Sequence, residues 1–263
     1  MKSLKKIIIK NFITESGKQG ITVLQQLLLV PLFISFWNVD TYADWIVISV
    51  IPTYLLLSNF GLVTYGGNLV CIEYNKNKKN EVNFIYKNVF FFVSVLILSS
   101  LAIFLLFDYL FNFTHILKIS SLSQTSIWIV VILLVLKYLF YTYTLFLLQL
   151  LKAIRKYHIM NLVIISTNLT ELILIITILF RGGRILDVAF VGVLNHFIAF
   201  IFSYLFLKKR FRWFKTKKTR ISLLYFKKIF YPSISFMIPN LSNAIIIQGT
   251  IIFIATSLNN NLL

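Results

Sequence analysis

Apolar residues dominate seven long segments of this chain, and short polar connections separate them. Each segment is close to the ~20 residues with which a helix crosses a ~30 Å hydrocarbon layer. None alternates polar and apolar residues with a period of two, as a membrane β-barrel strand would. The segments are 18–37, 44–65, 84–107, 124–149, 159–180, 185–207 and 232–256. We therefore predict an all-α, polytopic membrane bundle with about seven transmembrane helices.

Two local patterns refine this prediction. Residues 4–15 place apolar side chains at helical spacing among lysines, which predicts an amphipathic helix leading into the first span. Gly61, Gly66 and Gly67 close the second segment, where small residues favour the close approach of neighbouring helices.

Proline and charge divide the chain further. Pro31, Pro52 and Pro239 fall inside predicted spans, and each is expected to kink its helix because proline lacks the backbone donor. The connection after the sixth segment is long and basic, and its interleaved aromatic residues are typical of a helix lying in the membrane interface. We predict a six-span lobe over 1–207, a cytoplasmic linker over 208–231, and the first helix of a second lobe over 232–263.

The basic residues predict the orientation in the membrane. Of the 26 Lys and Arg residues, 22 lie in the N-terminal arm or in every second connection. By the positive-inside bias, these parts and the N-terminus face the cytoplasm. The net charge of +18 would also suit a nucleic-acid-binding protein. Here the charge lies in short loops beside apolar spans, where anionic lipid headgroups are the expected partner, and we predict no nucleic acid.

Ionisable residues inside the membrane are costly and usually face a bundle interior or a cavity. Lys137, Glu171 and His196 lie near the middle of the fourth, fifth and sixth segments. Counting from the connections between these segments, at the 1.5 Å rise of a helix, puts all three at about the same depth. Four polar residues fall near this layer and complete the set of candidate cavity residues: Gln25, Gln26, Asn168 and Asn243.

Two interpretations of the charged residues stay open at this point. Lys137 and Glu171 could form a buried ion pair that only fixes helix packing. Alternatively they line a cavity, where Lys137 attracts an anionic substrate group and Glu171 or His196 takes up a proton or cation. Two interpretations also stay open for the aromatic residues Trp37, Tyr42 and Trp45, which could anchor the protein in the membrane interface or stack on a sugar.

The first two segments carry motifs that resemble a known family. The stretches are Gly17-Lys-Gln-Gly20, Leu24-Gln25-Gln26-Leu27, Pro31-Leu-Phe33, Phe36-Trp37, Tyr42-Ala-Asp-Trp45, Ile51-Pro-Thr-Tyr54, Leu57-Ser-Asn-Phe-Gly61 and Gly67-Asn68. Together they resemble Wzx-type polysaccharide flippases, such as those of O-antigen, in the multidrug/oligosaccharidyl-lipid/polysaccharide exporter superfamily. The resemblance implies two six-helix, MATE-like lobes around a central cavity.

This resemblance also implies a function, the movement of polyprenyl-pyrophosphate-linked oligosaccharide across the bacterial cytoplasmic membrane. The alternatives are a drug or metabolite extruder of the same superfamily and a membrane-embedded polysaccharide polymerase. Because family members usually have twelve or more spans, a fragment, a frameshifted product and an unusual short member are all considered. A second lobe or polysaccharide assembly proteins would then be partners.

We expect no enzymatic activity, catalytic residue or cofactor. Nor do we expect a metal site, since Cys71 is the single cysteine.

Overall fold

The computed structural model describes residues 2–112, 114, 119, 121–214, 220–239, 241–242 and 244–246. Regular structure within these residues is helical: α1 Lys2–Trp37, α2 Val39–Leu56, the 3₁₀ turn η1 Leu57–Asn59, α3 Leu62–Asn75, α4 Lys79–Phe111, α6 Gln124–Ala153, α7 Tyr157–Phe180, α8 Ile185–Arg210 and α9 Leu223–Ile234. Among the described residues, six helices are long and apolar enough to cross a membrane: α1, α2 with η1, α4, α6, α7 and α8. The prediction of an all-α polytopic membrane bundle is confirmed.

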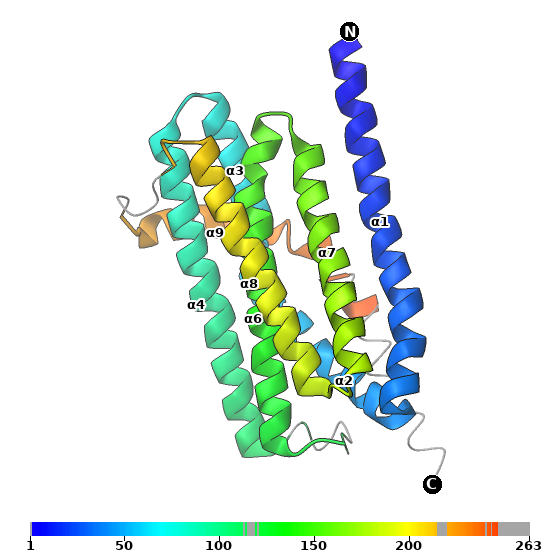
Figure 1. Ribbon diagram of the computed structural model, residues 1–263. Coiled ribbons are helices and arrows are strands. Elements are labelled where there is room, and N and C mark those ends of the chain that lie inside the picture. Colours follow the sequence, from blue (N-terminus) through cyan, green and yellow to red (C-terminus); the bar gives the residue numbers. More distant parts are fainter. Residues whose placement is uncertain are drawn as a thin grey trace.

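The long helices run roughly side by side, with α4 and α1 on opposite edges in Figure 1. Helix α8 packs mainly on α6, and α1 packs mainly on α7. The apolar core gathers where α3, α4 and α6 meet, and it includes Val89, Val130 and Leu147, which are all fully buried. This core holds α6 in place, and α6 in turn supplies one side of the charged cluster described below.

The second predicted span is not one continuous helix. Helix α2 ends at Leu56, and the chain passes through left-handed conformations at Phe60 and Gly61, with φ of 49° and 73°, before α3 begins. Gly61 is required here for two reasons. Its positive φ is strained for any residue with a Cβ, and a Cβ would lie 2.4 Å from the carbonyl oxygen of Ser233. The break therefore lies at Gly61 and not at Pro52, which stays inside α2.

Helix α1 joins the predicted lead-in segment and the first span in a single helix of 36 residues. At 1.5 Å per residue it rises about 54 Å, well beyond the ~30 Å hydrocarbon layer. Pro31 lies inside this helix. The predicted close approach at the glycines of α3 is confirmed, since a Cβ on Gly66 would lie 2.9 Å from Val89 and one on Gly67 would lie 2.6 Å from Gln149.

In the basic connection after α8, residues 211–214 turn into the core, whereas the sequence predicted an interfacial helix there. Helix α8 continues to Arg210, and then Phe211 and Phe214 turn inward and are buried. Phe214 packs edge-on against Tyr86 at 5.1 Å between ring centroids. The aromatic residues of this connection therefore belong to the core, and a separate helix, α9, follows with Ser222 as its N-cap.

The seventh predicted span begins differently from the expectation. Pro232 lies within α9, and a turn over 235–237 follows this helix, whereas the sequence predicted one helix from Pro232 with a kink at Pro239. Pro239 lies just after the turn in a short helical stretch. The rest of that predicted span, from 247 onward, lies outside the described residues. The division into two lobes and a linker stays a prediction.

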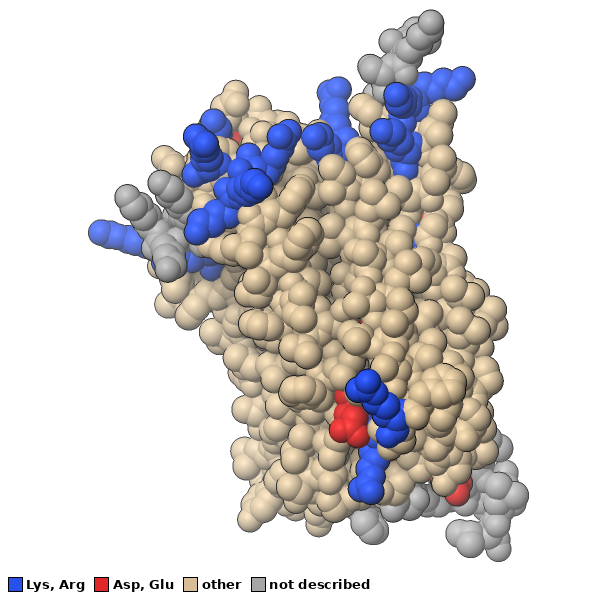
Figure 2. Space-filling model, viewed as in Figure 1, with Lys and Arg blue, Asp and Glu red and all other residues tan. Residues whose placement is uncertain are grey.

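Charge is distributed unevenly along the bundle. Figure 2 shows Lys and Arg gathered at the end where the N-terminus lies, with a smaller group towards the opposite end. We call the end opposite the N-terminus the far end. The α1–α2 and α7–α8 connections, the end of α4 and the start of α6 all lie there (Figure 1).

Candidate functional site

Lys137 of α6, Glu171 of α7 and His196 of α8 meet inside the bundle. The Lys137 Nζ lies 2.5 Å from Glu171 Oε1, and His196 Nε2 lies 3.9 Å from the other carboxylate oxygen. Side chains from α6 and α8 therefore meet the Glu171 carboxylate of α7, at the shared depth that the sequence predicts. We call these three residues the charged cluster.

The side chains of the charged cluster are largely buried. The side chains of Lys137, Glu171 and His196 are 17%, 10% and 5% exposed. The Lys137 ammonium lies 5.4 Å from the ring centroid of Tyr138, within the range of a cation–π contact. The ring of Tyr141 packs edge-on against His196 at 5.6 Å between centroids. Burial of such an ion pair removes its hydration, which is unfavourable. The attraction between the two charges and the contacts with neighbouring groups must offset this loss.

Gly192 makes room for this arrangement, and sequence reasoning missed it. A Cβ at this position would lie 3.0 Å from Lys137 Cδ and 3.5 Å from Glu171 Oε1. The carbonyl oxygen of Gly192 also lies 3.0 Å from His196 Nδ1. The available signal was its place four residues before His196, on the same face of the predicted helix. Gly192 therefore lets the lysine stem pass close to α8.

Side-chain amides at similar depth form hydrogen bonds between α7 and the helices on both of its sides. Asn195 Nδ2 donates to the carbonyl oxygen of Thr167 at 3.0 Å, a contact that the sequence did not suggest. Gln25 Nε2 donates to the carbonyl oxygen of Asn168 at 2.8 Å. Its neighbour Gln26 is exposed, so the two adjacent glutamines do not share a face. Asn243 lies outside the described residues.

The contact between α1 and α7 extends over the full length of α7. Near the N-terminal end of the bundle, Tyr157 Oη and Asn161 Nδ2 both donate to Glu15, at 2.9 and 3.0 Å. At the far end, Trp37 Nε1 donates to the carbonyl oxygen of Gly183 at 2.7 Å. Asn161 therefore belongs to the α1–α7 contact and not to the charged cluster.

Two buried carboxylates fix the α4–α6 connection at the far end. Asp108 is fully buried and accepts hydrogen bonds from Thr114 N at 2.7 Å, Gln124 Nε2 at 2.5 Å and Trp128 Nε1 at 2.6 Å. Asp44 of α2 accepts from the backbone N–H of Ser121 at 2.7 Å. Sequence reasoning missed the hydrogen-bonding role of both aspartates.

In the part of the chain that the structure describes, no three His, Cys, Asp or Glu residues lie close enough together to hold a metal ion. Whether the protein uses a metal or cofactor stays untested.

The fold and the charged cluster define a class: a multi-pass α-helical membrane protein with ionisable side chains buried between three of its spans. Residues 8–261 match the polysaccharide biosynthesis protein family, and the chain belongs to that family. The match extends over nearly the whole chain, whereas the motifs noted above end at Asn68. No curated protein and no solved structure matches the chain. A role in polysaccharide biosynthesis follows from the family.

Proposed function

We propose that this protein takes part in moving a lipid-linked oligosaccharide across the bacterial cytoplasmic membrane, as Wzx-type flippases do. The observation that carries the proposal is the ion pair between Lys137 and Glu171, buried inside the bundle of a polysaccharide biosynthesis protein. A substrate that crosses the membrane on a polyprenyl diphosphate carries its negative charge into this layer. A lysine at that depth is the complementary group.

The charged cluster suggests how binding could be linked to release. With His196 neutral, the charges of Lys137 and Glu171 cancel. A diphosphate that pairs with Lys137 would leave the Glu171 carboxylate without its partner in a low-dielectric setting, which is unfavourable. Uptake of a proton or cation at Glu171, with His196 beside it, would restore neutrality. Substrate binding and ion uptake would thus favour each other at one site.

We further propose that the basic end of the bundle faces the cytoplasm. Its lysines and arginines would lie at the anionic surface of the inner leaflet, each contributing about 1 kcal/mol of attraction. The far end, with its short connections, would then face outward. Substrate would enter from the basic side and leave at the far end.

Transport in reconstituted vesicles tests the proposal. The protein is inserted with a fluorescent polyprenyl-diphosphate saccharide, and the fraction reached by a membrane-impermeant reagent is followed over time. We expect Lys137→Met to abolish the protein-dependent rate. Lys227→Met, which removes an exposed lysine of α9, is the control and should keep it. Equal rates in protein-containing and empty vesicles, or a fully active Lys137→Met variant, would contradict the proposal.

A further inference from the structure

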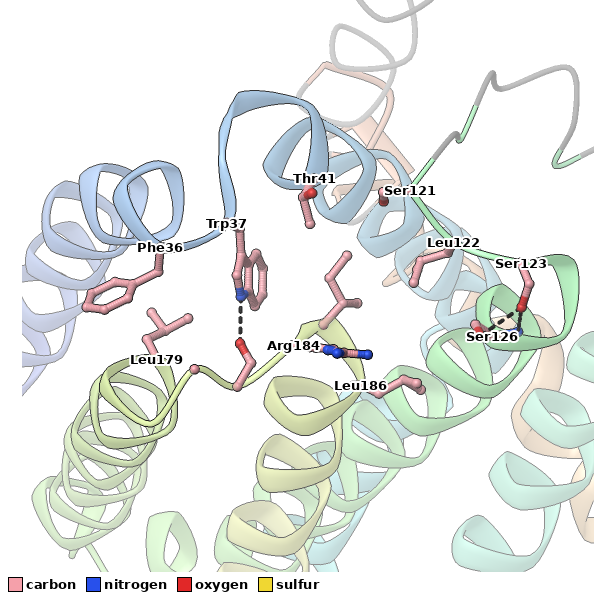
Figure 3. A pocket seen from close by; sticks show the side chains of 13 residues that line it. Phe36, Trp37, Thr41, Ser121, Leu122, Ser123, Ser126, Leu179, Arg184 and Leu186 are labelled. Carbon is pink, nitrogen blue, oxygen red and sulfur yellow. Dashed lines mark hydrogen bonds between the residues drawn. The ribbon is translucent and has the colours of Figure 1, made fainter.

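Residues at the far end of the bundle line an open cavity of about 570 Å³. Its walls come from the α1–α2 turn, from the segment before α6 together with the first turn of α6, and from the α7–α8 turn (Figure 3). We call it the end cavity. It is distinct from the charged cluster, since no residue of that cluster lines it. Its volume lies within the ~300–1,000 Å³ typical of small-molecule sites.

The lining of the end cavity combines hydroxyl groups, one cation and two aromatic rings. The hydroxyls belong to Thr41, Ser121, Ser123 and Ser126. Figure 3 shows the Arg184 side chain lying between Trp37 on one side and Ser126 on the other. None of the described residues that line the cavity carries a carboxylate. The electrostatic preference of this lining is therefore for a ligand with negative charge.

Two carboxylates near the cavity, those of Asp44 and Asp187, are engaged with the backbone. Asp44 accepts from Ser121 N at 2.7 Å, and Asp187 accepts from Arg184 N at 2.8 Å. These bonds shape two of the cavity walls. Among the described residues, the Arg184 guanidinium forms no salt bridge. Without a carboxylate partner there, the guanidinium can present donors to an oxygen-rich ligand.

Trp37 is held rigidly at the wall of the end cavity. Its indole nitrogen donates to Gly183 O at 2.7 Å, and its ring stacks on Phe33 with centroids 4.5 Å apart. A fixed aromatic surface beside hydroxyls and a cation suits a ring that is apolar on its C–H faces and polar at its edge. A sugar ring has this character, and an anionic substituent would reach the guanidinium as a charge-assisted pair.

We propose that the end cavity binds an acidic sugar residue, one that bears a carboxylate, of the oligosaccharide as it leaves the bundle. This inference rests on the proposed function, since it supplies that function with a saccharide subsite at the exit. Arg184 would pair with the carboxylate and Trp37 would pack against the ring. The serine and threonine hydroxyls would exchange hydrogen bonds with the sugar hydroxyls.

Calorimetric titration of the full-length protein in nanodiscs tests the site without any lipid-linked substrate. The probes are a disaccharide that contains glucuronic acid and its neutral glucose counterpart. We expect saturable binding of the acidic probe that is at least about tenfold tighter than that of the neutral one, consistent with a charge-assisted hydrogen bond. Arg184→Gln should remove this preference. Arg181→Gln, three residues earlier in the same turn and not in the lining, should retain it.

The outcomes separate this inference from the proposed function. No saturable binding, or an equal effect of Arg181→Gln and Arg184→Gln, overturns the subsite. The double variant Lys137→Met/Glu171→Leu, which leaves no buried charge unpaired, should keep disaccharide binding unchanged while it abolishes transport. Disaccharide binding by a wild-type protein that shows no transport activity would reject the flippase proposal and keep the saccharide site. Transport that depends on Lys137, in a protein that does not bind the disaccharide, would keep the flippase proposal and reject the saccharide site.

Discussion

At the residue scale, Asp108 shows how a carboxylate is accommodated away from water. It is fully buried, and donors from Thr114, Gln124 and Trp128 surround it. Hydrogen bonds to a charged group contribute more than neutral ones, and donors left unpaired in a buried site are costly. The contribution of Asp108 should therefore be to stability, by holding the α4–α6 connection in place.

Replacing Asp108 with Ala should lower the free energy of unfolding by about 2–4 kcal/mol, because several buried donors lose their acceptor at once. Denaturant-induced unfolding in detergent measures this loss. Asp40→Ala is the matched control, since Asp40 is exposed in the first turn of α2, and its effect should stay within about 0.5 kcal/mol. Equal stability of the two variants would show that the Asp108 network contributes nothing.

Some residue contacts could be predicted from the sequence because they depend only on counting. Lys137, Glu171 and His196 share a depth whenever three helices are joined by short connections, so their common depth required no knowledge of packing. Gly192 depends on how closely α8 approaches α6, and periodicity does not encode that distance. The same limit applies to Gln25 and Gln26, which differ only in the face they present to α7.

At the element scale, the break between α2 and α3 depends on a contact that is distant in sequence. Hydropathy runs on through 44–65 without interruption, which explains why one span was expected there. The chain breaks at Gly61 because the backbone of 233–237 packs directly against it. A local pattern cannot reveal a partner some 170 residues away, although the glycine itself was visible.

Gly61→Ala should therefore be strongly destabilising, by more than about 2 kcal/mol, because it combines left-handed strain with a backbone clash. Gly20→Ala provides the control within α1. A Cβ there meets nothing within 4 Å, and in a helix interior alanine is favoured over glycine by up to about 1 kcal/mol. Thermal unfolding in detergent compares the two variants. The account of the break is wrong if Gly61→Ala unfolds at the wild-type temperature.

At the scale of the whole molecule, the separation of charge predicts a fixed orientation. A reporter enzyme that works only outside the cytoplasm should be active when fused after Gly182 and silent when fused after Lys79, since the first site is at the far end and the second at the basic end. Activities are normalised to the amount of fusion protein in the membrane. The opposite pattern would contradict the proposed orientation and, with it, the assignment of the end cavity to the outward side.

The central claim is that the Lys137–Glu171 pair acts in transport and not only in packing, and a double substitution separates the two roles. Removing one partner of a buried pair leaves a charge uncompensated and costs about 3–5 kcal/mol, whereas replacing both with apolar residues is often neutral. Lys137→Met and Glu171→Leu should each lower the unfolding temperature, and the double variant should recover it. Vesicle transport is measured on the same protein samples.

We predict that the double variant folds as stably as the wild type and does not transport. Full transport by that stable double variant would contradict the account, because it would reduce the charged cluster to a packing device.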